Sequence, residues 1–451
     1  MQKLFKSPNI IFKYLTAAVI MGIILYPKFP FLRLPGIHVA IRLEDFLLAA
    51  IAIICGFYLL PRARSVFSLK IEKAILIYLA VGFISLLSAI FLTRTVDYGV
   101  GILHWIRRIE YFIPFFLGVL AVRKKENLGF YLNVLMLTLI IVFLYGAGQK
   151  YLHWPIIVTQ NLEYAKGIAL RYVSGSHINS SFAGHYDLAT FLTLVLPIFI
   201  SLFFIIKKIK PRIILGLSIF SGLWLLLASI SRISIVSYLV GSVIALFILK
   251  KYRAILLVVV FSLVFFSFSV DLRVRYLRII DEANKRLGDA SLIIYAQESL
   301  PEKEAISVTP SPTPIPLVED RSSAIRLNVE WPRAIRAFTK NPLLGTGYSS
   351  ITLATDNDYL RVLGETGILG FIAFGLIFLR LFKLMISGKA LSNKSSTDLE
   401  KAFFAGIIGG SVGVLINALF IDVFEASKFA IIYWLLTGLM IGLIRKEKYI
   451  D

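Results

Sequence analysis

The stretch that decides the fold is NPLLGTGYSSITLATDNDYLRVLGETGILG, from Asn341 to Gly370. Asn341-Pro342 predicts the end of a preceding helix, and Gly345 and Gly347 predict a turn with positive φ or a close backbone approach. Asp356-Asn357-Asp358 stands directly before an apolar run. One of these three residues is therefore expected to cap a helix whose positive N-terminus faces the acids. A polar loop returns to the membrane here, and the acids are expected at its surface.

A polar stripe continues into this predicted helix. Helical spacing places Asn357, Arg361 and Glu365 on one face, and Arg361 can pair with Glu365 or with Asp358. Because charge is expensive at membrane depth, we expect this face to look onto a cavity or onto other helices rather than onto lipid.

The composition is typical of a polytopic membrane protein. The 451 residues are 58% hydrophobic and only 17% charged, which excludes the soluble classes. The net charge of +21 comes from short basic clusters between apolar runs, so anionic lipid is the expected partner and nucleic acid is not. The single cysteine, Cys55, lies in an apolar segment and predicts neither a disulfide framework nor a cysteine metal site. Arg107-Arg108 and Glu110 are interpreted as a structural ion pair or an anchor.

The apolar segments predict an all-α polytopic fold with about twelve transmembrane helices. If all twelve helices cross the membrane, every basic cluster and both termini lie on the same side of it. We expect this side to be cytoplasmic. The count predicts an N-terminal bundle of about nine spans over residues 1–270, an extracytoplasmic loop over 271–356 and a C-terminal bundle of about three spans over 357–451. The segments are residues 11–26, 43–60, 71–92, 110–122, 130–149, 182–206, 212–230, 231–249, 254–270, 359–384, 402–421 and 428–444.

The large loop lies between the ninth and tenth predicted spans, on the face where function is expected. It contains TPSPTPIP, Thr309 to Pro316, which predicts an extended spacer that forms no core. Beyond the spacer we expect one short helix within Ser322 to Trp331 and a second beginning at Pro332.

Arginines and acids at this outer face suggest a site that binds a phosphate or diphosphate and accepts a proton. A guanidinium group offers a planar fork of donors that suits a phosphate or diphosphate, although an arginine near a helix end also reaches lipid headgroups without any ligand. The acids from Asp356 to Asp358 are able to accept a proton from an attacking sugar hydroxyl, or simply to cap the helix. The candidate arginines are Arg171, Arg232, Arg326, Arg333 and Arg336.

Other polar residues leave two interpretations open. His177 and His185, with Asp187 nearby, are either acid or base groups or ordinary residues at headgroup level, and their spacing does not favour a metal site. Gly345 and Gly347 either present backbone N–H groups to a phosphate or form a plain turn. We expect no metal and no cofactor.

Several motifs resemble the O-antigen ligase and Wzy-type O-antigen polymerase family. The run WPRAIRAFTKNPLLGTGYSSI followed by TDNDYLRVLGETGILGFIAF resembles the family's tryptophan and arginine helix, its NP-L-x-G-x-G turn and its polar pair before YL…E-x-G-x-x-G. The segment from Arg171 to Ala183 and the pair Ser231-Arg232 are similar to two earlier motifs of the family. Together these motifs cover roughly Arg171 to Gly370, whereas the first five predicted spans resemble the family only in hydropathy.

The resemblance implies a metal-independent, inverting transferase that moves a glycan from undecaprenyl diphosphate to an acceptor sugar on the outer side of the cytoplasmic membrane. It implies that Arg171 and Arg232, supported by Arg326, hold the diphosphate leaving group, an electrostatic task that needs no cofactor. Ligases of the family commonly carry His-Asn where this chain has Asp356-Asn357. This pair is therefore the catalytic candidate and favours a polymerase or general polysaccharide transferase over a lipid A core ligase. Secondary candidates are Arg333, Arg336, His177, Glu365, Gly345 and Gly347.

The donor repeat unit, a glycan or lipid-linked acceptor, and the choice between polymerisation and ligation stay open at this point. A transporter or flippase of lipid-linked oligosaccharide would share the spans, but it should place charges mid-span, where this chain has only Glu365. A peptidoglycan polymerase of the shape, elongation and division type would show motifs that this sequence lacks. A non-catalytic membrane scaffold predicts that replacing Arg232 or Asp356 leaves glycan products unchanged.

Overall fold

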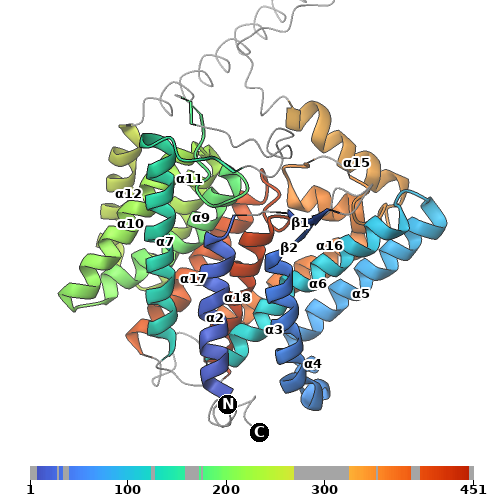
Figure 1. Ribbon diagram of the computed structural model, residues 1–451, viewed down its shortest axis with the longest axis horizontal. Coiled ribbons are helices and arrows are strands. Elements are labelled where there is room, and N and C mark those ends of the chain that lie inside the picture. The colour runs from blue at the N-terminus through green and yellow to red at the C-terminus, as the bar shows by residue number, and fades with distance from the viewer. Residues whose placement is uncertain are drawn as a thin grey trace, which may run out of the picture.

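The computed structural model describes residues 8–27, 30–33, 40–122, 127–157, 172–173, 176–268, 325–351, 354–386 and 397–445. Within these ranges the chain is a bundle of long helices (Figure 1), with one short antiparallel pair of strands between the first two. The strands are β1 (Pro30–Arg33) and β2 (Ala40–Arg42). Most of the large predicted loop, including the proline-rich spacer, lies outside the described residues.

Each apolar segment predicted from the sequence overlaps a long helix, although α6 begins well before the predicted segment of residues 110–122. The apolar runs drive this outcome, since a helix satisfies its own backbone groups where no water is available. The long helices are α2 (Pro8–Leu25), α3 (Leu43–Leu59), α5 (Lys70–Ser88), α6 (Tyr98–Ala121), α7 (Asn127–Tyr151), α9 (His185–Ile205), α10 (Ile209–Ser229), α11 (Arg232–Ile248), α12 (Tyr252–Ser267), α16 (Asp358–Ile386), α17 (Asp398–Asn417) and α18 (Ser427–Ile444). The short elements are η1 (Leu60–Arg62), α4 (Ala63–Phe67), η2 (Ala89–Thr93), η3 (Arg326–Glu330) and α15 (Trp331–Lys340).

Eight helical segments of the described chain are long and apolar enough to cross a membrane. α2, α11 and α12 are apolar but shorter, and α6 carries Arg107, Arg108 and Glu110 near its middle. Apart from the short strand pair, the described chain is helical, and the predicted helical membrane fold is confirmed. The number of crossings, twelve, stays a prediction.

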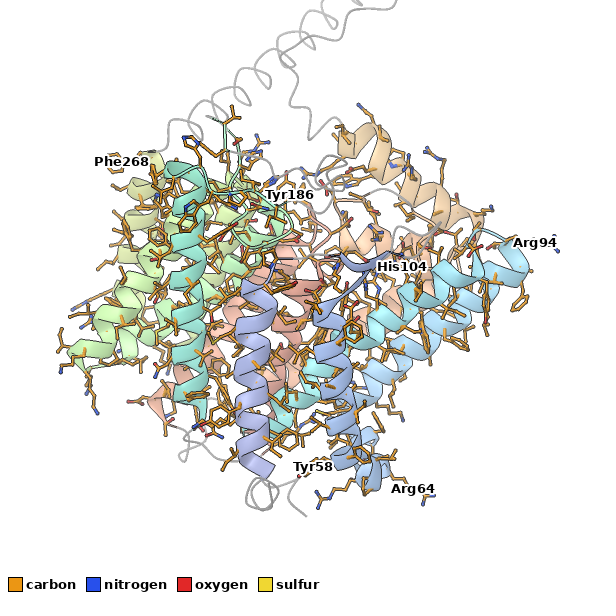
Figure 2. The ribbon with its side chains drawn as sticks, in the orientation of Figure 1. Tyr58, Arg64, Arg94, His104, Tyr186 and Phe268 are labelled. Atoms are coloured by element: carbon orange, nitrogen blue, oxygen red, sulfur yellow. The ribbon has the colours of Figure 1, made fainter. Side chains whose placement is uncertain are left out.

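The two ends of the bundle differ. Tyr58 and Arg64 lie at one end beside α4, whereas Tyr186 and Phe268 lie toward the other end, which we call the α15 end (Figure 2). Arg445, just after α18, donates to Glu72 at the start of α5 (2.6 Å), so these segments also meet at the end away from α15. Two of the predicted basic clusters, those of Arg64 and Arg445, therefore lie at the end opposite α15, while the side of the membrane that each end faces stays a prediction.

Small residues on α17 let this helix pack closely against its neighbours. A Cβ placed on Gly406 would lie 2.4 Å from the Ile198 Cα of α9, and one on Gly409 would lie 2.1 Å from the Gly241 carbonyl oxygen of α11. Such contacts let backbones approach and pack, which is the usual basis of helix association in membranes. The connection that leaves α17, residues 418–426, therefore starts from a rigid part of the molecule.

The signature stretch forms an interlock with a broken helix. α16 is interrupted at Gly367 (φ 66°, ψ −170°), and the turn of residues 341–347 enters the break. In a continuous helix, the N–H groups of residues 368 and 369 would bond to the carbonyls of 364 and 365. The turn supplies substitutes for all four groups: Thr346 N–H donates to Gly364 O (3.0 Å), Gly347 N–H to Glu365 O (2.8 Å), Ile368 N–H to Pro342 O (2.9 Å) and Leu369 N–H to Leu343 O (3.3 Å).

Both glycine-rich segments are needed for this contact. Gly345 has φ of 69° and Gly347 has φ of 88°, so the predicted positive φ is confirmed. A Cβ on Gly345 would lie 2.4 Å from the carbonyl carbon of Glu365, so the predicted close approach is also confirmed. The approach is to the protein's own backbone, and it fixes the chain on both sides of Asp356.

Candidate active site

Asp356 and Arg326 form an ion pair at the α15 end of the bundle. The Arg326 Nε and Nη2 atoms lie 2.9 Å and 2.8 Å from Asp356 Oδ2. Arg326 Nη2 also lies 3.4 Å from the hydroxyl of Tyr186, which belongs to α9 and is labelled in Figure 2. The predicted base and one predicted diphosphate ligand are thus brought together from η3 and from the segment before α16.

The environment of Asp356 pulls its pKa in two directions. Burial raises the pKa of this carboxyl above its ordinary value and the nearby Asp422 raises it further, while the Arg326 guanidinium lowers it. Burial is the largest of these effects, so the pKa of Asp356 is raised overall. A carboxylate with a raised pKa is a stronger proton acceptor, as a general base requires.

Asn357 caps α16, as the sequence predicts for one residue of this trio. Its Oδ1 accepts the N–H of Leu360 (2.9 Å), and its Nδ2 donates to the carbonyl of Leu419 (3.0 Å). Both ends of the amide are therefore engaged in holding the start of the helix. This geometry gives Asn357 a structural task beside the catalytic role that the resemblance implies.

Asp422 is the residue that sequence reasoning missed at this site. Its carboxylate accepts the N–H groups of Thr355 (2.8 Å) and Asn357 (3.1 Å), the residues on either side of Asp356, and it pairs with Arg361 Nη1 (2.9 Å). Asp422 lies in the connection between α17 and α18, 65 residues from Asn357. No local motif links two segments that far apart in the chain.

A buried cluster of charges lies beneath the Asp356 turn. Arg361 Nε is 3.5 Å from Glu365 Oε1 and 3.5 Å from Glu425 Oε1. Arg108 pairs closely with Glu425, and its Nη2 lies 3.9 Å from Glu365 Oε2. The polar stripe therefore faces other helices, which confirms the expectation from the sequence, and the opposite charges offset the cost of their burial.

The predicted pairings of Arg361 and Arg108 have different outcomes. Arg361 pairs with Glu365, one of its two predicted partners, and the carboxylate of the other, Asp358, accepts the N–H groups of Val423 (2.7 Å) and Phe424 (3.1 Å). Arg108 pairs with Glu425 and Glu365 rather than with Glu110. Val423, Phe424 and Glu425 belong to the connection before α18, which lies close to Asp358 and Arg108 in space although it is distant from them in sequence.

The Glu425 carboxylate shows how strongly the arginines act. Its burial by itself would raise its pKa, but Arg108 and Arg361 outweigh the burial and lower the pKa of Glu425 to about 2. Glu425 is therefore held as a carboxylate and is not a proton donor.

The other arginine candidates are spread over the same end. Arg232 is the first residue of α11 and is half-buried. The preceding Ser231 lies 2.7 Å from Ser234, whose hydroxyl donates to Asn417 at the end of α17 (3.1 Å). These bonds join the start of α11 to the end of α17, whereas Arg171 lies outside the described residues. On α15, Arg333 is half-buried and Arg336 is exposed.

The remaining candidates have well-defined surroundings. The rings of His177 and His185 stack with centroids 4.1 Å apart, and His185 lies equally close to Tyr186. The N–H groups of Gly345 and Gly347 donate to Asn341 O and Glu365 O, which favours the interpretation of this segment as a turn. In the described part of the chain, no group of three or more His, Cys, Asp or Glu residues is placed to hold a metal ion.

Glu330 is a second carboxylate that the sequence analysis did not single out. It ends η3, four residues after Arg326. Burial raises the pKa of Glu330 to about 7, Asp356 and Asp422 raise it as well, and Arg326 and Arg333 lower it. The pKa of Glu330 therefore depends on the charges of Asp356 and Asp422.

Comparison with known proteins supports the resemblance. Residues 217–375 match the family model described as O-antigen ligase. The matched segment runs from α10 into α16 and contains Arg232, Arg326, Asp356 and the interlocked glycine segments. Among curated proteins no match was found.

Proposed function

We propose that the chain is a membrane glycosyltransferase that moves a glycan from undecaprenyl diphosphate to an acceptor sugar, because residues 217–375 match the family model described as O-antigen ligase. The family supports a role in membrane glycan processing of the O-antigen ligase or polymerase type. The observation that carries the finer proposal is the contact of Arg326 with Asp356 (2.8 Å) at the α15 end. It joins a proton acceptor to a group able to bind phosphate.

In the proposed reaction, Asp356 accepts the proton of the acceptor hydroxyl. The acceptor oxygen then forms a bond to the anomeric carbon, the bond from that carbon to the diphosphate oxygen breaks, and the electron pair leaves with the diphosphate. A single displacement from the opposite face inverts the anomeric configuration. Arg232, with Arg171 and Arg326, stabilises the negative charge that grows on the leaving diphosphate, a task that fixed guanidinium groups perform without a metal.

Arg326 has a second task before the acceptor binds. Its charge opposes the effect of burial on the pKa of Asp356 and so favours the ionised carboxylate. A base must be ionised at the start of the step, and its proton affinity must rise as the acceptor oxygen attacks. We propose that the donor diphosphate draws Arg326 away from Asp356, which raises the proton affinity of Asp356 when both substrates are present.

The Asp356-Asn357 pair favours polymerisation of a polysaccharide, or a general polysaccharide transfer, over ligation to a lipid A core. The α15 end is then the extracytoplasmic face of the inner membrane, and both termini are cytoplasmic. The large loop of residues 271–356 carries η3 and α15 to the site.

A transporter of lipid-linked oligosaccharide is the second candidate, because the buried cluster of Arg108, Arg361, Glu365 and Glu425 places charge among the helices. The close pairing within the cluster favours a structural role over a transport path, since a path needs charges that interact with cargo.

The test separates donor binding from transfer. Purified protein in liposomes receives a lipid-linked oligosaccharide, and donor affinity and product formation are measured for Arg232→Gln and Asp356→Asn. Arg64→Gln is the control, because Arg64 is exposed at the opposite end of the bundle. We expect Arg232→Gln to weaken donor binding and transfer, Asp356→Asn to abolish transfer with donor still bound, and the control to behave as wild type. Transfer at the wild-type rate by both site variants would refute the proposal.

A further inference from the structure

The connection between α17 and α18 carries a carboxylate, Asp422, for which the proposed reaction has no use. We propose that Asp422 is the positioning residue for Asp356, holding it in the orientation in which it receives the acceptor's proton. This inference rests on the proposed function of Asp356 as the base.

The geometry of Asp422 is that of a clamp across one residue. Its Oδ2 accepts the N–H of Thr355 (2.8 Å) and its Oδ1 accepts the N–H of Asn357 (3.1 Å). The Asn357 N–H belongs to the peptide group that directly follows Asp356, and the Thr355 N–H belongs to the residue that directly precedes it. With both neighbours fixed, the remaining freedom of Asp356 is largely that of its side chain.

The backbone at Asp356 requires such support. Its φ of 49° lies in the left-handed region, which residues other than glycine seldom adopt and which persists only where surrounding contacts enforce it. Strained backbone of this kind clusters at functional sites. Here the strain turns the Asp356 side chain toward Arg326 while the neighbouring amides turn toward Asp422.

The clamp is itself anchored from two sides. Arg361, one turn into α16, bonds to Asp422 Oδ2 (2.9 Å), and the Asp358 carboxylate returns the contact by accepting the N–H groups of Val423 and Phe424. The start of α16 and the connection before α18 thus hold each other through carboxylates on both partners. Asp422 is only 12% exposed, so water competes weakly for these hydrogen bonds.

Asp422 also acts on Asp356 through its charge. The charged groups that face Asp356 are Arg326 and Glu330 from η3 and Asp422 from the connection, with the Tyr186 hydroxyl close by on α9. The negative charge of Asp422 raises the pKa of Asp356. Neutralising Asp422 removes this effect, so the pKa of Asp356 falls and the acid limb of the activity profile moves to lower pH.

The experiment compares Asp422→Asn and Asp422→Glu in the full-length protein in liposomes, with lipid-linked oligosaccharide as the probe. Asparagine keeps the size but removes the charge and one of the two acceptors, so we expect kcat to fall by about 10-fold to 100-fold with KM for the donor changed less than about 2-fold. We also expect the acid limb to move to lower pH. Glutamate keeps the charge, so its acid limb should stay at the wild-type pH while kcat is only partly restored.

Two outcomes would overturn the inference. In the first, Asp422→Asn has the wild-type kcat and an unshifted acid limb. In the second, Asp422→Asn has a lower kcat but its acid limb does not move. The second would show that Asp422 merely supports folding. The activity of Asp356→Asn is measured in parallel. If Asp356→Asn keeps its activity, the proposed function fails, whereas an inactive Asp356→Asn with a normal Asp422→Asn refutes the clamp alone.

Discussion

Replacing Gly367 with alanine should open the interlock between α16 and the turn of residues 341–347. Gly367 has φ of 66° and ψ of −170°, a backbone region that is almost exclusive to glycine. A Cβ at this position would lie 2.4 Å from the carbonyl group of Leu343 and 2.6 Å from the amide nitrogen of Gly345. These neighbours are backbone atoms, so no side chain can rotate away to make room.

The expected cost follows from these two effects. The unfavourable backbone conformation contributes about 1–3 kcal/mol, and forcing a methyl group into a packed interior contributes about 1–3 kcal/mol. The sum, about 2–6 kcal/mol, is large beside the total stability of a typical protein.

The matched control is Gly375→Ala, because Gly375 lies in the same helix and a Cβ there would meet nothing within 4 Å. Alanine is the better helix former by up to about 1 kcal/mol, so the control should be neutral or slightly stabilised. Thermal unfolding of both variants in detergent, followed by tryptophan fluorescence, gives the comparison. Transfer activity measured below the transition reports whether the Asp356 turn is still in place.

If Gly367→Ala unfolds at the same temperature as Gly375→Ala, the interlock does not hold the break in α16. The four backbone hydrogen bonds across it would then be too weak to position the site.

Three further outcomes are expected. Glu425→Gln leaves two buried arginines without their shared counter-charge and should destabilise the protein by about 3–5 kcal/mol. In the wild type the pKa of Glu425 is lowered from 4.5 to about 2. The free energy of unfolding should therefore be constant above about pH 4.5 and should decrease as the pH falls toward 2. Asn357→Ala removes the cap of α16 and should cost about 1 kcal/mol in thermal unfolding, whereas an unchanged unfolding temperature would contradict the capping role. In a Cys55→Ser background, an impermeant maleimide should label Thr339→Cys in intact cells and Arg62→Cys only after lysis, and the reverse pattern would invert the proposed topology.

The sequence predicted the elements well because their cause is local. The long apolar runs predicted every long helix of the described chain, and the Asp356-Asn357-Asp358 trio predicted a cap that the structure places at Asn357. The i, i+4 spacing of Arg361 and Glu365 also predicted their pairing.

The partners of the site were not predictable because they are distant in the chain. Asp422 reaches Thr355 across 67 positions, and Glu425 reaches Arg108 across 317. The sequence analysis treated Arg108 as part of a local ion pair and passed over both acids, since a lone Asp or Glu before the last helix has no pattern that reveals a buried role. The sequence likewise does not show that Gly345 and Gly367 join the turn to α16, because this contact is visible only in the tertiary structure.

The central claim is that Asp356 drives glycosyl transfer from a lipid diphosphate, and the most direct measurement follows both products at once. Wild type and Asp356→Asn are reconstituted with lipid-linked oligosaccharide, and free undecaprenyl diphosphate is quantified beside the lengths of the glycan chains. Our account predicts that wild type forms a ladder of longer glycans with one diphosphate released per bond made, and that Asp356→Asn forms neither product. Movement of the donor between leaflets without diphosphate release, or equal product from the variant, would contradict it.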